Sequence, residues 1–171
     1  MERLWAPWRI DYILGSEKEP GCIFCTKPSS SRDEDNLIVH RAQGAFTMMN
    51  KFPYNSGHLL ISPYRHVWDL CQLDPEESSL LIQEVCRAVE VLRSVMHPEG
   101  FNVGLNLGAA AGAGIEEHLH YHVVPRWNGD TNVLPVLADV RLIPEHIRST
   151  CGKLREAFSR LYPDKDGSEE K

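Results

Sequence analysis

Residues 118–126 read His-Leu-His-Tyr-His-Val-Val-Pro-Arg, with histidine at every second position from His118 through His120 to His122. Side chains alternate between the two faces of a β-strand, so a strand over residues 118–124 places the three imidazoles on one face and the intervening apolar side chains on the other. Two plain explanations compete with a catalytic one. The histidines could fill solvent-facing strand positions by chance, or they could bind a metal ion, for which imidazole is a common ligand.

The segment just before the histidines favours a phosphate ligand. Residues 108–114 consist of three glycines and four alanines, which is typical of a tight loop with exposed backbone. Unpaired backbone N–H groups of such a loop bind anions such as phosphate. Phosphate beside imidazole indicates phosphoryl or nucleotidyl transfer.

The surrounding sequence predicts a single α+β domain over residues 1–171, built on an antiparallel five-stranded sheet with two main helices. Asp74, Pro75 and Glu77 form a capping box with proline at the first helical position, which starts a helix over residues 75–97. A second helix is predicted over residues 144–161. Residues 1–21 are expected to form an N-terminal extension and residues 163–171 a frayed tail. The other four strands are predicted at residues 36–40, 45–50, 58–62 and 101–107.

Composition limits the partners. The formal net charge of −6 argues against a broad basic surface for polymeric nucleic acid, although it allows a pocket for one nucleotide. We find no apolar run of signal-peptide or membrane-spanning length, so we expect a cytoplasmic enzyme that does not enter a membrane. We expect no organic cofactor.

The alternating histidines after a glycine-rich loop resemble the histidine triad (HIT) superfamily, and the resemblance runs from about Cys22 to Arg126. It extends to Ile23-Phe24-Cys25, to Met49-Asn50 and to the segment 57–63, Gly-His-Leu-Leu-Ile-Ser-Pro. Residues 4–9, 110–115 and 125–132 resemble, more narrowly, bacterial members described as diadenosine tetraphosphate phosphorylases.

The resemblance implies roles for the histidines. It makes His120 the nucleophile on an α-phosphate, forming a nucleotidyl-histidine intermediate that divides one displacement into two. His122 and His58 are then expected to donate hydrogen bonds to phosphate oxygens, and His118 to orient the nucleophile. Loop amides around Gly112 and Gly114 would stabilise developing negative charge.

The resemblance also implies contacts with the nucleotide. Asn50 corresponds to a ribose-binding position, Phe24 and Met48 are placed to line a base pocket, and Asn106 is suited to reach the polyphosphate. Core packing is the alternative explanation for Phe24 and Met48. Arg126 could hold an inorganic phosphate, or it could face solvent after the strand.

One position departs from the family. Many members carry Gln and then Ser or Thr four and three residues before the first histidine, whereas Gly114 and Ile115 stand there in this sequence. Phosphate contacts are therefore expected to come more from the backbone. The departure leaves open whether water, inorganic phosphate or another acceptor resolves the intermediate.

Cys22 and Cys25 have the spacing that lets two thiolates bind one tetrahedral ion, but a single Cys-x-x-Cys is half a zinc site and could also be a redox pair. Family members that keep this pair complete the site with histidines that correspond to His66 and His118. The resemblance therefore implies a structural zinc ion.

Together these features predict a nucleotidyl transferase that cleaves dinucleoside polyphosphates such as diadenosine tetraphosphate, with phosphorolysis favoured. The alternatives are a dinucleoside polyphosphate hydrolase, a nucleoside phosphoramidase, and a nucleotide-binding interaction module with little turnover. The family is commonly dimeric, so a homodimer is expected.

Overall fold

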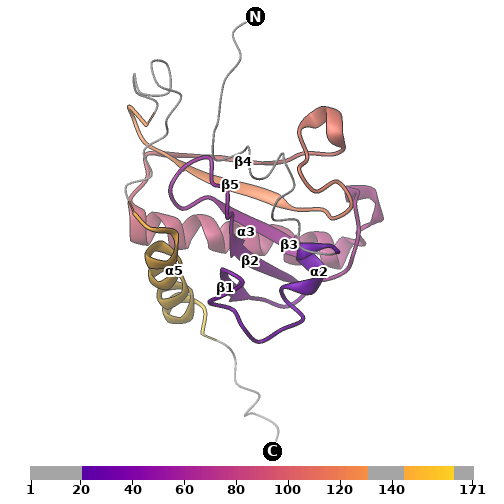
Figure 1. The fold of residues 1–171 in the computed structure, drawn as a ribbon, viewed down its shortest axis with the longest axis horizontal. Coiled ribbons are helices and arrows are strands. Elements are labelled where there is room, and N and C mark those ends of the chain that lie inside the picture. Colours follow the sequence, from indigo (N-terminus) through magenta and orange to yellow (C-terminus); the bar gives the residue numbers. More distant parts are fainter. Residues whose placement is uncertain (1–20, 131–144, 164–171) are drawn as a thin grey trace, which may run out of the picture.

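The computed structural model describes residues 21–130 and 145–163. They form a five-stranded sheet with the order β1-β2-β3-β5-β4, in which every neighbouring pair is antiparallel (Figure 1). The predicted α+β class and five-stranded antiparallel sheet are confirmed. The predicted N-terminal extension and frayed tail lie almost entirely outside the described residues. The strands are β1 (Ile38–Arg41), β2 (Ala45–Met49), β3 (Leu59–Pro63), β4 (Gly100–Leu105) and β5 (Tyr121–Arg126).

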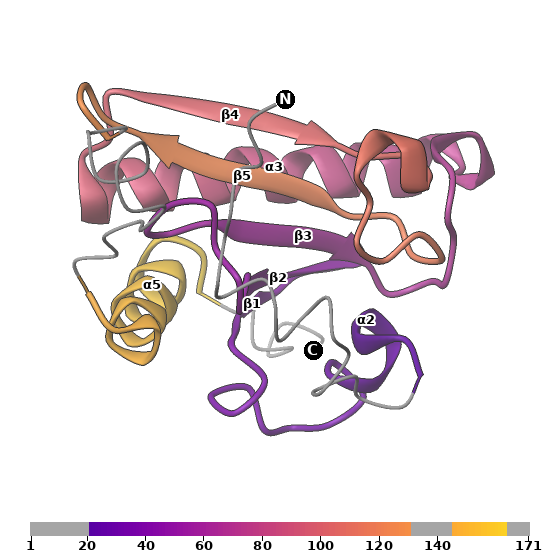
Figure 2. The same ribbon diagram turned by 45° about the horizontal axis from the view of Figure 1, so that its top comes forward.

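The two main helices cover one face of the sheet (Figures 1 and 2). Helix α3 (Pro75–Met96) begins at the predicted capping box: the Glu77 N–H donates to Asp74 Oδ1 over 2.8 Å, and the Asp74 N–H donates to Glu77 Oε2 over 3.0 Å. Helix α5 (Ile147–Leu161) packs against α3 and β1. No helix of the described segments is long and apolar enough to cross a membrane. The short helices are α2 (Ile23–Thr26), η1 (Leu70–Gln72) and η2 (Ala109–Ala111).

The sheet separates two apolar clusters. The larger one joins the buried faces of α3 and α5 to one side of the sheet, where Leu59, Leu119 and Val123 contribute. The smaller cluster lies on the other side and consists of Phe24, Ile38, Phe46, Met48 and Leu60. All five residues of β2 are therefore buried, because both faces of this strand are covered.

The structure corrects the predicted start of the last strand. We expected it at His118, but β5 begins at Tyr121, which pairs with Ile61. Continuing this register would place Leu119 opposite Pro63, which has no N–H to donate to the ladder. The Ser62 hydroxyl donates instead to the Leu119 carbonyl over 2.9 Å. Residues 118–120 therefore follow an irregular path beside the end of β3.

Candidate active site

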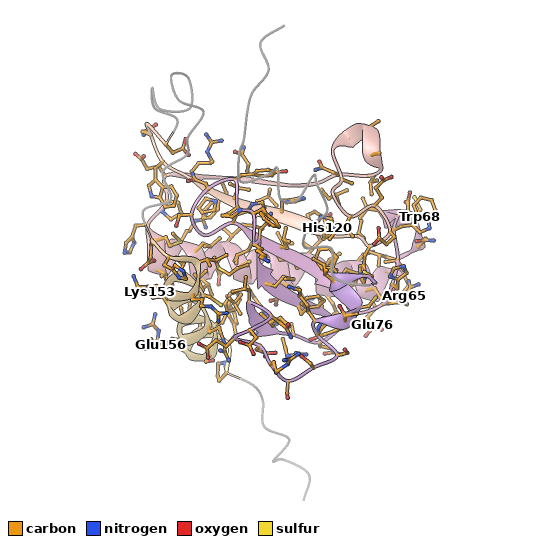
Figure 3. The ribbon with its side chains drawn as sticks, viewed as in Figure 1. Arg65, Trp68, Glu76, His120, Lys153 and Glu156 are labelled. Atoms are coloured by element: carbon orange, nitrogen blue, oxygen red, sulfur yellow. The ribbon has the colours of Figure 1, made fainter. Side chains whose placement is uncertain are left out.

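The histidines of residues 118–122 share one side of the chain, as the alternation predicts. The ring centroids of His120 and His122 are 4.9 Å apart, and the Phe24 ring lies 5.3 Å from His118 and 4.7 Å from His120. Leu119 and Val123 point the opposite way, into the cluster beneath α3 and α5. Figure 3 shows His120 within the body of the molecule, whereas the labelled Arg65 and Lys153 lie near its outline.

The hydrogen bond of His120 fixes which nitrogen carries its proton. Nδ1 lies 2.8 Å from the carbonyl oxygen of His118, which can only accept, so Nδ1 carries the hydrogen and Nε2 keeps its lone pair. The side chain is buried, and this burial lowers the pKa of His120 from its ordinary value, against smaller opposing effects of the His118 carbonyl and Glu117. His120 is therefore a neutral imidazole with an available Nε2.

A second chain of hydrogen bonds fixes the other two rings. The Tyr54 backbone N–H donates to His58 Nδ1 over 3.1 Å, so His58 carries its hydrogen on Nε2. That Nε2–H donates to His122 Nδ1 over 2.9 Å, which leaves the hydrogen of His122 on its own Nε2. Among the described residues, His122 Nε2 is the one buried side-chain nitrogen or oxygen with no hydrogen-bond partner. An unpaired buried donor of this kind is expected to meet a ligand acceptor.

Both rings of this pair are held neutral. Burial, followed by the nearby His122 and His120, lowers the pKa of His58 to about 3. Burial, followed by His120, lowers the pKa of His122 to about 4. Near pH 7 each ring therefore has one donor and one acceptor nitrogen.

This arrangement corrects the predicted role of His58. We expected it to donate to phosphate, but its single N–H is already donated to His122, and the side chain is fully buried. Asn50, the predicted ribose contact, lies beside it, with Nδ2 3.3 Å from His58 Nδ1 and Oδ1 accepting from the Phe52 N–H over 2.9 Å. His58 thus contacts the other histidines rather than an open space.

The turn before β3 explains how His58 becomes buried. Gly57 has φ +76°, and a Cβ built there would lie 2.5 Å from Met96 Sδ on α3. Only glycine combines that backbone conformation with so close an approach. The turn therefore packs directly on α3 and directs the next residue, His58, into the sheet.

The other predicted nucleotide contacts fall into two groups. Phe24 and Met48 are 0% and 2% exposed and belong to the smaller apolar cluster, as the core-packing alternative describes. Asn106 directly follows β4, whose last residue, Leu105, pairs with Tyr121, so it lies near the start of β5. Gly112 and Gly114 are exposed on the loop that leads to His118.

The Arg126 guanidinium binds side chains that lie away from the histidines. Its Nε and Nη2 donate to Asp130 Oδ2 and Oδ1 over 2.5 and 2.8 Å, and its Nη1 donates to Asn102 Oδ1 over 2.7 Å. It also lies at the far end of β5, roughly 20 Å from His120 by the rise of an extended strand. The suggestion that Arg126 holds a phosphate at His120 is therefore wrong.

A second cluster, which we call the metal-type cluster, has ligand atoms that all lie within 4.8 Å of one another. It consists of Cys22, Cys25, His66 and His118. His118 Nε2–H donates to the Pro63 carbonyl over 3.0 Å, so its Nδ1 has a free lone pair. This Nδ1 lies 3.2 Å from Cys22 Sγ and 3.5 Å from Cys25 Sγ, and His66 Nδ1 lies 3.3 Å from Cys25 Sγ. These nitrogen and sulfur donors converge on one point, as a tetrahedral metal ion requires.

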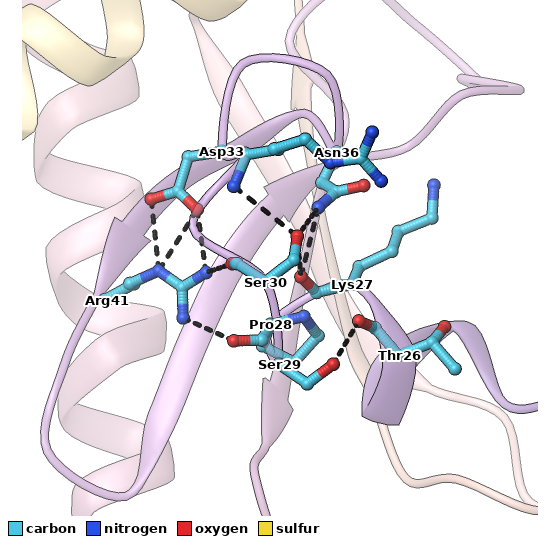
Figure 4. A network of polar contacts seen from close by, with 9 residues as sticks. Thr26, Lys27, Pro28, Ser29, Ser30, Asp33, Asn36 and Arg41 are labelled. Carbon is cyan, nitrogen blue, oxygen red and sulfur yellow. Dashed lines mark hydrogen bonds and ion pairs between the residues drawn. The ribbon is translucent and has the colours of Figure 1, made fainter.

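Cys25 lies in α2, a single turn that has Cys22 as its N-cap, and a network around Arg41 connects the loop after this turn to β1 (Figure 4). The Arg41 guanidinium donates to the carbonyls of Pro28 and Ser30, both over 2.7 Å, and to both oxygens of Asp33. Arg41, the last residue of β1, thereby fixes the loop between α2 and β1. Sequence reasoning missed Arg41, because nothing in its local pattern shows which carbonyls it reaches.

Comparison with known proteins agrees with this geometry, since residues 31–129 match the HIT domain. The chain belongs to the histidine triad family. It is 39% identical over 168 residues to a Mycobacterium tuberculosis protein named AP-4-A phosphorylase, covering 94% of this chain and 86% of that protein. A HIT-like protein of Methanocaldococcus jannaschii is 29% identical over 113 residues, covering 66% of this chain and 84% of the relative.

Two solved HIT structures resemble this fold. A Zn-bound histidine triad family protein from Mycobacterium smegmatis matches with a TM-score of 0.66 and 28% identity, covering 82% of this chain and 95% of that chain. A hypothetical histidine triad nucleotide-binding protein from Sulfolobus tokodaii matches with a TM-score of 0.65, covering 85% of this chain and 99% of that chain. At 21% identity this second match bears on the fold alone.

The match to the HIT domain begins after α2 and ends before α5. It contains the candidate nucleophile His120, the neighbouring His58 and His122, and the candidate metal ligands His66 and His118. Cys22, Phe24 and Cys25 lie outside it, although they contact its central histidines. The site of this HIT protein is thus assembled from the family domain and a turn that precedes it.

Proposed function

We propose that this HIT protein is a nucleotidyl transferase that cleaves dinucleoside polyphosphates such as diadenosine tetraphosphate through a nucleotidyl-His120 intermediate. One observation carries the proposal: His120 is a buried neutral imidazole whose Nε2 lone pair is free, and its ring lies 4.9 Å from that of His122, whose Nε2–H has no partner. A nucleophile and a donor for the attacked phosphate are thus neighbours.

The first step follows from these tautomers. His120 Nε2 attacks the α-phosphorus, an N–P bond forms, and the P–O bond to the leaving nucleoside polyphosphate breaks. Nδ1 keeps its hydrogen, so the imidazole gains a positive charge while it donates to the His118 carbonyl. A hydrogen bond from a charged donor is stronger than one from a neutral donor, so this contact favours the intermediate over the free enzyme.

His122 supports this step directly, and His58 supports it through His122. The His122 Nε2–H donates to an oxygen of the attacked phosphate, and His58 holds His122 in the tautomer that can do so. The Tyr54 N–H in turn fixes His58. The Gly112 N–H donates to the Ala109 carbonyl over 2.9 Å, so the loop around Gly112 and Gly114 is proposed to lie against the polyphosphate without a donor from Gly112. Asn106 is proposed to contact the polyphosphate, and Asn50 the ribose.

The second step decides the product. Inorganic phosphate attacks the nucleotidyl phosphorus, the P–N bond breaks, and a nucleoside diphosphate leaves with His120 restored. The 39% identical Mycobacterium tuberculosis relative is named AP-4-A phosphorylase, which supports this acceptor over water. Hydrolysis and phosphoramidate cleavage use the same intermediate and are the enzymatic alternatives.

The Cys22–Cys25–His66–His118 cluster is proposed to hold a structural zinc ion. The donor set suits zinc, the tautomer of His118 presents Nδ1, and a 28% identical HIT structure is Zn-bound. Burial raises the pKa of the Cys22 thiol, so a cation is needed to hold it as a thiolate at neutral pH. The metal would connect the turn before the family domain to the central strand.

A homodimer is also proposed. β4 is an edge strand of the sheet, and its residues 102–104 are exposed in succession, with Val103 47% exposed. Unpaired strand edges invite pairing with another chain. Polymeric nucleic acid is not a proposed partner, because the net charge is −6.

Product analysis tests the proposed reaction. Diadenosine tetraphosphate with millimolar phosphate should give ADP and ATP, which chromatography separates from the AMP and ATP of hydrolysis. AMP as the sole product would reject phosphorolysis and leave the hydrolase. Rapid quenching followed by intact-mass measurement should show one adenylyl group on the wild-type protein and none on His120→Ala. Absence of any adduct and any turnover would favour the nucleotide-binding interaction module.

A further inference from the structure

Phe24 has an unusual position relative to the proposed nucleophile. It lies in α2 between Cys22 and Cys25, which belong to the metal-type cluster. Its ring is stacked on the His120 ring, with centroids 4.7 Å apart and planes inclined by 28°. No part of Phe24 is exposed. A residue carried by the cysteine turn therefore covers one face of the catalytic imidazole.

His120 has few other restraints on its orientation. Its Nδ1–H donates to the His118 carbonyl, and the His122 ring meets it edge-on with planes inclined by 60°. Nε2 must stay free for attack, so it cannot anchor the ring. The stacked face of Phe24 then blocks the rotation that would carry Nδ1 away from the carbonyl.

The support behind Phe24 is stiff. A helix of four residues is not stable by itself, but α2 is fixed at its ends by the cysteines beside His66 and His118 and by the loop that Arg41 holds. Phe46 packs behind Phe24, with ring centroids 6.4 Å apart. Phe24 therefore cannot move away from His120 without disturbing these contacts.

We propose that Phe24 is a positioning residue that holds the His120 imidazole with Nδ1 on the His118 carbonyl and Nε2 toward the phosphate. The proposal rests on the proposed function, in which His120 is the nucleophile. It differs from the expectation that Phe24 lines a base pocket, because a base-lining ring acts on substrate binding and a positioning ring acts on the chemical step.

The test compares Phe24→Leu with the matched variant Phe158→Leu. Both remove a fully buried ring that stacks on an imidazole, but Phe158 stacks on His40, in the cluster beneath α3 and α5, and does not touch the proposed nucleophile. Phe24→Leu should lower kcat about 10- to 100-fold with KM within about twofold, the size of effect that a small misplacement of a reacting group produces. Phe158→Leu should lower the melting temperature comparably and leave kcat within about threefold.

A spectroscopic measurement separates this inference from the proposed function. Long-range ¹H–¹⁵N spectra of ¹⁵N-histidine-labelled protein report which nitrogen of each imidazole carries the proton. The His120 signals are identified because they are absent from the spectrum of His120→Ala. Wild type and Phe158→Leu should show a single Nδ1–H form of His120, and Phe24→Leu a mixture of tautomers. This readout does not depend on turnover, so it stands whether or not His120 forms an adduct.

Three outcomes would overturn the proposal. The first is an unchanged His120 tautomer in Phe24→Leu. The second is a rise in KM at constant kcat, which would assign Phe24 to a base pocket. The third is an equal fall of kcat in both variants, which would attribute the loss of activity to a less stable core. Phe24→Met, which nearly keeps the side-chain volume, is measured in the same way if Phe24→Leu does not fold.

Discussion

His118 and His120 are two residues apart, yet their rings are held in opposite tautomers. His118 donates from Nε2 to the Pro63 carbonyl and turns Nδ1 toward Cys22 and Cys25. His120 donates from Nδ1 to the His118 carbonyl and leaves Nε2 free. The carbonyl that each ring meets decides which nitrogen remains available. A single sequence pattern is thereby divided between the metal-type cluster of Cys22, Cys25, His66 and His118 and the proposed catalytic cluster of His58, His120 and His122.

The two clusters also differ in what they require. The metal-type cluster joins α2, the segment after β3 and the segment before β5, so its loss should weaken the fold. The catalytic cluster ends on a buried donor without a partner, His122 Nε2, so its integrity matters chiefly when a ligand is bound. Variants in the first should therefore change stability, and variants in the second should change turnover.

The largest expected effect is the loss of turnover when His120 of the proposed catalytic cluster is replaced. His120→Ala should lower kcat by at least about 10³-fold, since loss of a covalent nucleophile removes the chemical step. Nucleotide binding should stay within about tenfold, because ground-state contacts remain. Steady-state kinetics and calorimetric titration measure both quantities.

His97→Asn is the matched control for that variant. His97 is an exposed left-handed residue at the end of α3, and asparagine tolerates this conformation well. Its turnover should equal that of the wild type. Substantial turnover in His120→Ala would remove the nucleophile from the proposal.

Variants of the metal-type cluster should change zinc content and stability rather than the chemical step. Wild-type protein purified without added metal should contain about one zinc per chain by atomic emission. Cys22→Ser should lower zinc affinity by more than the roughly 10- to 100-fold typical of losing an outer-shell partner. It should also lower the melting temperature, by about 2–4 °C for each kcal/mol of stability lost.

Cys86→Ser provides the comparison, because Cys86 is an exposed cysteine on α3. Its zinc content and melting temperature should match the wild type. A metal-free wild-type protein that is equally stable and active would refute the zinc site and leave the cysteines as a redox pair.

The sequence could predict features that depend on neighbours along the chain. The capping box of Asp74 and Glu77 involves residues three apart, and the common side of the three histidines follows from alternation. The family resemblance supplied the residues of both clusters. The tautomers were beyond prediction, because they depend on distant partners, the Pro63 carbonyl for His118 and the Tyr54 N–H for His58.

The roles that failed had the same cause. His58 was expected to contact phosphate, and only the fold shows that its N–H is already donated to His122, 64 residues away. Arg126 was a candidate phosphate ligand, but its guanidinium forms an ion pair with Asp130.

The pH dependence of stability offers a smaller effect within the catalytic cluster. The folded pKa values of His58 and His122 are lowered to about 3 and about 4, below the ordinary value of 6.5. Between these values the unfolded chain binds more protons than the folded one, so the free energy of unfolding falls as the pH drops. This contribution is complete above pH 6.5 and is lost as the pH falls through about 4 and 3.

Urea unfolding of wild type and His122→Gln from pH 7 to pH 4 isolates this contribution. Release of a metal at low pH affects both proteins alike, whereas only the wild type has the His58–His122 pair. The wild type should lose stability more steeply than the variant over this range. Parallel slopes would show that the pair does not oppose protonation in the folded protein.

The smallest effect is expected at Asn50, which lies beside His58 and is the proposed ribose contact. Asn50 Nδ2 is 3.3 Å from His58 Nδ1, but the Tyr54 N–H donates to the same nitrogen over 3.1 Å. Because the backbone donor remains, Asn50→Ala should leave the tautomers of His58 and His122 unchanged, and kcat with them. Loss of one neutral hydrogen bond to ribose, worth about 0.5–1.5 kcal/mol, should raise KM by about 2- to 10-fold. Asn102→Ala is the control, since Asn102 bonds Arg126 at the far end of β5, and its KM should not change. A fall of kcat at constant KM in Asn50→Ala would place the amide in the histidine chain rather than on the ribose, and would make His58 dependent on two donors instead of one.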